Sequence, residues 1–197
     1  YDEMEHGLDT SGSWQGEMLN RRKGGEVFPV RLSIDVVHDS DGEIVQYVVV
    51  FSDISEIKQH QAELDRIAHY DPLTGVPNRR LLDDRLAQAI ARAKRSGKGL
   101  AICYMDLDGF KLVNDYYGHA AGDRLLVEIA TRLRQTLRGE DTVARLGGDE
   151  FVMLFGDLSD SSEIGKALDR VLAEVNRPVL VEGGIAKVSA SIGYTVY

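Results

Sequence analysis

The chain has 197 residues and a formal net charge of −9, with 32 acidic and 23 basic residues. This length allows one complete domain and part of a second, and the acidic balance argues against a nucleic-acid partner. The single cysteine, Cys103, lies in an apolar segment, and the sequence shows no disulfide framework and no signal or membrane-spanning segment. The composition fits a cytoplasmic domain, whether or not the parent protein is anchored in a membrane.

Residues 1–53 are expected to form alternating strands joined by turns. Asp39-Ser40-Asp41-Gly42 is typical of a hairpin turn, and the apolar run Tyr47 to Phe51 follows it. With Trp14 and Phe28-Pro29-Val30 upstream, this region resembles the C-terminal half of a PAS sensor domain. Because earlier PAS elements are missing, we expect no complete ligand pocket, and Trp14 is interpreted as a packing residue. The alternative is a small β-extension with no sensory role.

Residues 54–70 are expected to form a connecting helix. Four apolar side chains and Gln61 recur at steps of three and four residues, at Ile54, Ile57, Gln61, Leu64 and Ala68. Such a stripe is compatible with a short parallel coiled coil between two chains. It is equally compatible with a helix packed on its own domain.

The segment from Leu100 to Met105 predicts a strand buried on both faces, with Asp106 at its carboxyl end. Asp106 and Asp108 are two residues apart, so in a strand they point the same way. Carboxylates at such a position are ligands that Mg²⁺ prefers. The alternative for Asp108 is that it caps the helix that follows.

A second acidic pair lies at a predicted turn. Gly147 and Gly148 separate two apolar runs, which indicates a β-hairpin that carries Asp149 and Glu150 at an exposed tip. Glycines there let another backbone or a nucleotide approach closely. A purely structural turn is the alternative.

The remaining periodicity predicts three amphipathic helices and a final strand. The helical patterns span residues 81–90, 125–137 and 164–175, and residues 188–196 alternate as a strand. The element order β-α-α-β-β-α-β, which begins with the strand before Asp106, suggests an α+β fold. We predict a ferredoxin-like, palm-type antiparallel sheet with helices packed on one face, preceded by the PAS-like β-meander and the connecting helix. This order places the hairpin beside the Asp106 strand.

Several motifs together resemble the GGDEF family of diguanylate cyclases from about residue 65 to the end. The matching segments are Asp71-Pro72-Leu73-Thr74-Gly75-Val76-Pro77-Asn78-Arg79 (with Val76 where Leu is usual), Asp106 to Lys111, Asn114-Asp115, Gly118-His119, Gly122-Asp123, Arg145 with Gly147 to Phe151, and Ser191-Ile192-Gly193. The resemblance implies domains at 1–53 (PAS-like), 54–70 (connecting helix) and 71–197 (GGDEF, truncated at its C-terminus).

The resemblance implies that two GTP condense to cyclic di-GMP and release two pyrophosphates, with Mg²⁺ or Mn²⁺ as cofactor. The implied metal ligands are Asp106, the backbone carbonyl of Leu107, and Asp149. Asp149 also occupies the position often assigned as proton acceptor. Glu150 is either a second-metal ligand or an alternative base.

The resemblance also implies a substrate site and an inhibitory product site. Asn114 and Asp123 match guanine-binding positions, and His119 matches a substrate contact, although Asn114 and Asp123 also fit a helix terminus and a helix start. Phe110 and Lys111 open a helix whose N–H groups are suited to phosphates, with Lys111 adding charge. Arg138 and Asp141 match the site where cyclic di-GMP inhibits; otherwise they end a helix and begin a strand.

The family usually continues into a helix with a phosphate-binding lysine, which the sequence does not reach. We therefore expect this fragment to bind or turn over GTP poorly. Since one domain binds one GTP, catalysis implies a homodimer. The alternative function is a GTP- or cyclic di-GMP-binding regulatory module that controls an adjacent EAL phosphodiesterase domain in the parent chain.

Overall fold

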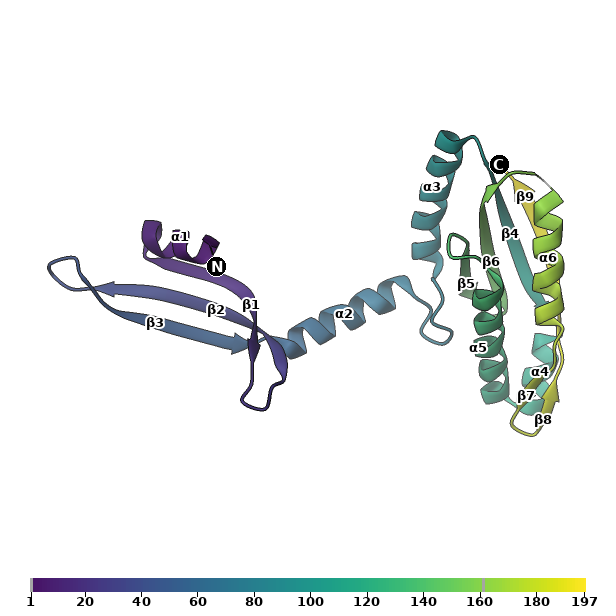
Figure 1. Cartoon of the computed structure of the whole chain (residues 1–197). Helices are drawn as coiled ribbons and strands as arrows, with labels where there is room; N and C mark the ends of the chain where they lie inside the picture. Colours follow the sequence, from purple (N-terminus) through teal and green to yellow (C-terminus); the bar gives the residue numbers. More distant parts are fainter. Residues whose placement is uncertain (1, 161) are drawn as a thin grey trace. The chain divides into compact units, whose positions relative to one another are not determined.

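A computed structural model describes residues 2–160 and 162–197. The chain forms two compact units, one ending at Asp65 and the other comprising Arg66–Tyr197, and each is described by itself (Figure 1). Within the described residues no helix is both long and apolar enough to cross a bilayer.

The first unit is a β-meander with one short helix. Helix α1 (Asp2–Ser11) precedes strands β1 (Ser13–Arg21), β2 (Val27–His38) and β3 (Ile44–Asp53), which pair antiparallel in chain order. The strands confirm the predicted meander, whereas α1 was not anticipated. The predicted turn is stabilised by Asp39, whose Oδ1 accepts hydrogen bonds from the N–H groups of Asp41 (3.0 Å) and Glu43 (2.9 Å). Such an Asx turn explains the choice of Asp there.

Helix α2 (Ser55–His69) follows the buried residue Ile54. The side chains of the predicted stripe are exposed over most of the helix: Ile57 is 56% and Leu64 is 67% exposed. Only Ser55 and the last residues, Ala68 and His69, are half-buried. This exposure does not favour the alternative in which the stripe packs on its own domain.

The second unit is built around a four-stranded antiparallel sheet of order β5-β6-β4-β9. Its elements are α3 (Arg79–Ser96), β4 (Gly99–Asp108), α4 (Phe110–Tyr117), α5 (His119–Thr136), β5 (Thr142–Gly147), β6 (Glu150–Leu158), α6 (Ser162–Val175), β7 (Val179–Val181), β8 (Gly184–Ala186) and β9 (Ser189–Val196). The sheet confirms the predicted α+β class. The small hairpin β7–β8 was not predicted.

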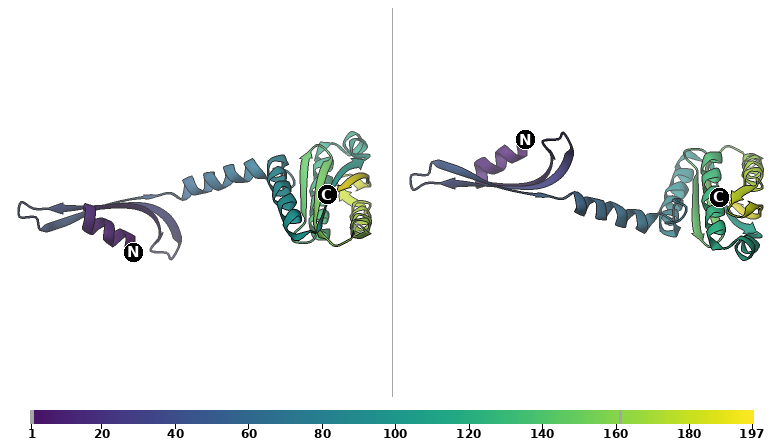
Figure 2. Two further views of the ribbon diagram at one scale, coloured as in Figure 1. Left: turned by 90° about the horizontal axis from the view of Figure 1, so that it is seen from above. Right: turned by 90° about the horizontal axis from the view of Figure 1, so that it is seen from below.

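Helices cover both faces of this sheet, so the expectation that they pack on one face was wrong. Alternate residues of β4 explain the difference. Cys103 and Met105 face a core shared with α5 and α6, whereas Leu100 and Ile102 face a second core under α3. The views of Figure 2 show α3 on the opposite side of the sheet from α6.

Strand β4 is buried on both faces only near its start. From Cys103 to Asp108 buried and exposed residues alternate, and Tyr104 is 45% exposed. The prediction of a strand buried on both faces therefore fails beyond the reach of α3. Consequently the even-numbered face of β4, which carries Asp106 and Asp108, is open at its carboxyl end.

Candidate functional site

The β5–β6 hairpin carries the signature carboxylates. Gly147 ends β5 and pairs with Glu150 at the start of β6, which leaves Gly148 and Asp149 as the two turn residues. Gly148 has φ of +54°, a left-handed value that favours glycine. Asp149 and Glu150 are half-buried rather than at a fully exposed tip, because β6 lies beside β4 in the sheet.

Asp106 lies opposite the hairpin, as predicted. It pairs with Glu150 of β6 on one side and with Ser191 of β9 on the other. The β6 ladder stops at this pair, whereas the β9 ladder continues to Asp108. Leu107 therefore has its side chain in the core and its backbone just beyond the last residue that β6 pairs.

Asp108 does not cap helix α4, and that alternative was wrong. Its two carboxylate oxygens accept hydrogen bonds from Ser191 Oγ (2.9 Å) and Ser189 Oγ (3.1 Å) on β9. Gly109 is the N-cap of α4, and within the described residues no side chain caps it by a hydrogen bond. The α4 N–H groups consequently remain available for an anion.

The carboxylates repel one another. Partial loss of solvent, together with the negative charges of Asp149, Glu150 and Asp108, raises the pKa of Asp106 above its ordinary value. Tyr104 lies at the edge of the group, where its hydroxyl is 3.5 Å from Glu150 Oε2 and can donate to it. A divalent cation would relieve this repulsion.

The donor set fits Mg²⁺ or Mn²⁺ only if substrate oxygens and water complete it. Over residues 2–160 and 162–197, no three or more His, Cys, Asp or Glu side chains are arranged to hold a metal by themselves. Asp106 and Asp149 with the Leu107 carbonyl supply hard oxygen ligands, and Mg²⁺ commonly uses one or two carboxylates plus phosphates. The electrostatic repulsion at Asp106 is the observation that favours a cation here.

The proposed guanine residues lie on α4 and α5, which meet at Gly118. Asn114 is half-buried in α4, and Asp123 is exposed in the second turn of α5. His119 is exposed at the first residue of α5. Phe110 is half-buried and Lys111 exposed in the first turn of α4. Thus α4 and α5 carry all five predicted substrate residues.

Gly122 is the close contact between these helices. A Cβ at this position would lie 1.9 Å from Asn114 Oδ1 and 3.3 Å from Phe110 Cζ. Asn114 Oδ1 is buried and finds no hydrogen-bond partner in the described part of the chain. The sequence indicated Gly122 only as the neighbour of Asp123 in a family motif and did not predict its contact with Asn114.

Arg138 and Asp141 enclose the loop between α5 and β5. The Asp141 carboxylate accepts hydrogen bonds from the N–H groups of Arg138 (3.0 Å) and Gly156 (3.3 Å), while the Arg138 side chain is exposed. Burial raises the pKa of Asp141 despite these two hydrogen bonds. Asp141 therefore closes the loop, and β5 begins one residue later than the alternative interpretation expected.

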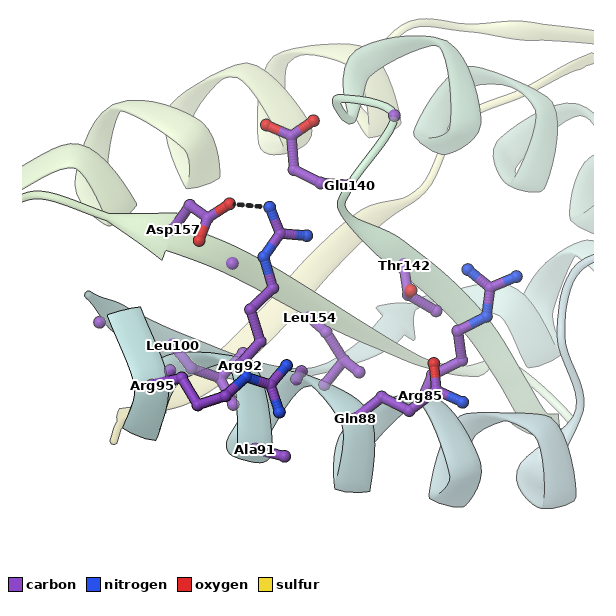
Figure 3. Close-up of a pocket in the computed structure, with 15 residues that line it drawn as sticks. Arg85, Gln88, Ala91, Arg92, Arg95, Leu100, Glu140, Thr142, Leu154 and Asp157 are labelled. Atoms are coloured by element: carbon purple, nitrogen blue, oxygen red, sulfur yellow. Dashed lines mark hydrogen bonds and ion pairs between the residues drawn. The ribbon is translucent and has the colours of Figure 1, made fainter. Parts of the chain in front are cut away.

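A basic cavity of about 470 Å³ lies beside this loop (Figure 3). Helix α3 contributes Arg85, Arg92 and Arg95, and the loop contributes Glu140. Arg92 forms an ion pair with Asp157, drawn as a dashed line in Figure 3. The charged groups that line the cavity are therefore three arginines and two carboxylates, and Gly139, which follows Arg138, also lines it.

Arg145 joins the β5–β6 turn to a distant loop, and the sequence did not reveal this connection. Its Nε and Nη2 donate to the Gly148 carbonyl (2.9 and 2.7 Å), and its Nη1 donates to Asp71 Oδ1 (2.9 Å). Burial raises the pKa of Asp71, but hydrogen bonds from Thr74 and Arg145 outweigh it and hold the pKa below its ordinary value. Asp71 and Arg145 each lie in a segment that resembles the GGDEF family, but no pattern in the sequence predicts that they contact each other.

The chain is similar to known families and proteins. Residues 68–197 match the family described as the diguanylate cyclase GGDEF domain, and residues 1–56 match a PAS domain. MucR of Pseudomonas aeruginosa, a bifunctional diguanylate cyclase/cyclic di-GMP phosphodiesterase, is 46% identical over 135 residues, which are 68% of this chain and 20% of MucR.

Two solved structures are similar to parts of this chain. The GGDEF domain of TpbB from Pseudomonas aeruginosa has a TM-score of 0.63 and 41% identity, covering 66% of this chain and 76% of that one. The coiled coil and GGDEF domain of DgcB from Caulobacter crescentus, in complex with c-di-GMP, has a TM-score of 0.65 and 27% identity, covering 73% and 77%.

The chain spans only a fifth of MucR and a third of the curated TpbB sequence. Its family model nevertheless covers most of it, and the sheet order, the hairpin and the Asp106 strand lie within the matched residues. The chain belongs to the GGDEF domain family of diguanylate cyclases, with a PAS domain segment before it.

Proposed function

We propose that this chain condenses two GTP molecules to cyclic di-GMP with release of two pyrophosphates. The observation that carries the proposal is the pairing of Asp106 with Glu150 next to Asp149, which gathers acidic oxygens at one end of the two central strands. Each 3′-oxygen would form a bond to the α-phosphorus of the other GTP, and the bond from that phosphorus to pyrophosphate would break. When bound, divalent metal would activate the attacking oxygen and offset the charge of the leaving pyrophosphate.

The side chains divide this work. Asp106, Asp149 and the Leu107 carbonyl would hold the metal. Glu150, whose carboxylate lies within reach of the Tyr104 hydroxyl, is either a further metal ligand or the base that accepts the 3′-hydroxyl proton. The N–H groups at the start of α4 and the charge of Lys111 would bind phosphates.

One catalytic domain would hold one GTP, so the reaction requires two copies that face each other. The exposed stripe of α2, which includes Ile57 and Leu64, is suited to pairing with a second chain. The PAS segment would act through this helix by setting how the two domains align.

The first test is direct. Full-length protein is incubated with GTP and Mg²⁺, and the products are analysed by mass spectrometry. We expect a species with the mass of cyclic di-GMP, dependent on Mg²⁺ or Mn²⁺. GTP binding without this product would instead favour a regulatory module.

That second candidate has one observation in its favour. MucR is described as a cyclic di-GMP phosphodiesterase as well as a cyclase, and the match with this chain covers only 20% of its length. An adjacent EAL domain in the parent protein would then be the regulated partner. Phosphodiesterase activity that changes with GTP, in a protein that makes no cyclic di-GMP, would establish this alternative.

Nucleotide choice provides a prediction about Gly122. In Gly122→Ala the new methyl group displaces the Asn114 side chain. Alanine is more favourable than glycine in a helix by about 1 kcal/mol, so the fold should be retained. We expect a higher KM for GTP and a weaker preference for GTP over ATP. Losing one base contact should cost on the order of 1–3 kcal/mol, and Asn114→Ala and Asp123→Ala should behave similarly.

The matched control is Gly165→Ala in α6, where an added Cβ meets no atom within 4 Å among the described residues. It should leave both KM values unchanged. If Gly122→Ala and Asn114→Ala both retain the wild-type GTP-to-ATP ratio, α4 and α5 do not bind the base.

Product feedback provides a prediction about Arg138. We propose that cyclic di-GMP binds at Arg138 and Asp141, and the exposed guanidinium beside a basic cavity supports this. Arg138→Ala should leave the initial rate unchanged and reduce inhibition by added cyclic di-GMP. Arg177→Ala, a surface arginine paired with Glu174, is the control. Equal slowing of wild type and Arg138→Ala during progress curves would exclude the site.

A further inference from the structure

Gly148 and Asp149 form the turn of the β5–β6 hairpin, which is the catalytic turn in the proposed function. The Arg145 side chain lies beside this turn, and its contacts are divided between two segments. Its side chain is 11% exposed, and that of its partner Asp71 is 16% exposed. One edge of the guanidinium, Nε with Nη2, is directed at the Gly148 carbonyl, and Nη1 is directed at the Asp71 carboxylate. Because the guanidinium is planar and rigid, these contacts fix the distance between the two segments.

The turn end of this connection is next to the catalytic carboxylate. Gly148 directly precedes Asp149, so the carbonyl that Arg145 binds belongs to the peptide unit that leads into Asp149. The turn has only two residues between its strands. A shift of the Gly148 carbonyl therefore moves Asp149 relative to Asp106.

The other end is a loop that is itself well anchored. Asp71 Oδ1 accepts hydrogen bonds from the Thr74 N–H (2.8 Å) and hydroxyl (2.5 Å), and the Asp71 N–H donates to the Val76 carbonyl (2.8 Å). Val76 is fully buried in the main core. The Arg145 N–H also donates to the Pro77 carbonyl (3.0 Å). The loop is thus a rigid support for the turn.

The same loop holds the last turn of α2. Asn78 donates from its backbone N–H to the His69 carbonyl (2.9 Å) and from Nδ2 to the Ala68 carbonyl (3.0 Å). Its Oδ1 accepts from the Leu81 N–H (3.1 Å), which caps α3. Residues 71–78 therefore contact the catalytic turn, the end of α2 and the start of α3.

We propose that Arg145 is a positioning residue for Asp149, which it holds in place by joining the Gly148 carbonyl to the Asp71 loop. The proposal rests on the proposed cyclase function, because it assigns Asp149 a reacting role. Arg145 touches no substrate atom in this scheme and acts through the turn. The loop 71–78 is then the common support of the catalytic turn and the end of α2.

The test compares Arg145→Lys with a matched arginine. Lysine keeps the charge but is a point donor that cannot span both contacts. The control is Arg132→Lys: Arg132 has a side chain 10% exposed and donates to the carbonyls of Glu174, Arg177 and Pro178, away from the hairpin. Both variants lose a buried, multiply bonded guanidinium, so both should unfold at a lower temperature than wild type.

Steady-state kinetics, measured at a temperature where all variants are folded, then distinguish Arg145→Lys from Arg132→Lys. Arg145→Lys should lower kcat about ten- to a hundredfold, with KM for GTP nearly unchanged, whereas Arg132→Lys should keep both values. Asp71→Asn should lower kcat in the same direction. The double variant Arg145→Lys/Asp71→Asn should lose no more than Arg145→Lys alone, because both changes break one connection. Wild-type kcat in folded Arg145→Lys, or losses that multiply in the double variant, would overturn the proposal.

Hydrogen exchange supplies a readout that does not depend on activity. Arg145→Lys, but not Arg132→Lys, should speed amide exchange in residues 71–78, where the Thr74 and Asn78 N–H groups are bonded. If wild type makes no cyclic di-GMP, the proposed function fails, while this exchange still decides the connection. Unchanged exchange in residues 71–78 of Arg145→Lys contradicts it.

Discussion

Asp149→Ala is expected to abolish cyclic di-GMP formation while leaving the protein folded. The substitution removes one of the two proposed side-chain metal ligands, and a metal-stabilised charge is worth several kcal/mol, so we expect at least about a 100-fold loss in kcat. The unusual backbone angles of the hairpin lie at Gly147 and Gly148, so alanine is tolerated at position 149. The unfolding free energy should change by no more than about 0.5 kcal/mol.

The control for this prediction is Asp169→Ala, at an exposed carboxylate of α6. It removes the same charge from the same domain and should leave kcat and KM unchanged. Initial rates are measured over a range of GTP and Mg²⁺ concentrations, with circular dichroism as the check on folding. A folded Asp149→Ala protein that retains most of its activity would remove Asp149 from the catalytic assignment.

The sequence was sufficient to predict the sheet and the relation of its two acidic segments. The apolar run before Asp106 and the glycine pair before Asp149 each define a local structure, and the element order then brings them together. What the structure adds is register. Asp106 pairs with Glu150, and the turn residues are Gly148 and Asp149 rather than the two glycines.

Contacts between distant residues were the part that the sequence could not provide. Arg145 and Asp71 are 74 positions apart, and each has an ordinary local explanation. Asp108 seemed suited to cap α4, but its partners are Ser189 and Ser191, on a strand about 80 residues later. Single-sequence patterns report periodicity along one element, and they carry no information on which side chains meet across a sheet.

The burial of β4 was overestimated because it also depends on a contact between distant elements. An apolar run such as that before Asp106 indicates burial on two faces, but the length of α3 decides how far the second face is covered. Tyr104 lies beyond that cover and approaches Glu150 instead. The roles of the individual site residues remain predictions, because they depend on a substrate and a metal.

Asp106→Asn is expected to abolish activity and, in the metal-free protein, to leave the melting temperature equal to or above that of wild type. The raised pKa of Asp106 means that its charged form is disfavoured in the folded state, by partial desolvation and by Asp149, Glu150 and Asp108. Asparagine keeps the shape and removes that charge. Such a gain in stability with a loss of function is expected where like charges are gathered to bind a cation.

The stability difference between Asp106→Asn and wild type should depend on pH. A carboxyl group whose folded pKa is raised destabilises the protein above that pKa and has no effect once it is protonated in both states. The advantage of Asp106→Asn over wild type should therefore be present at neutral pH and disappear as the pH falls through the raised pKa toward 3.8, the ordinary value for aspartate.

Bound metal should make the melting temperature of wild type higher than that of Asp106→Asn. A cation that binds only the folded wild type stabilises it by RT ln(1 + [M]/Kd), so its melting temperature rises with the logarithm of the metal concentration above Kd, and Asp106→Asn should gain little. Thermal unfolding with Mg²⁺ or Mn²⁺ and a non-hydrolysable GTP analogue measures this, with Asp169→Asn as the control. If Asp106→Asn gains as much from the metal as wild type does, the ion is bound elsewhere, and the acidic cluster at the end of β4 requires another explanation.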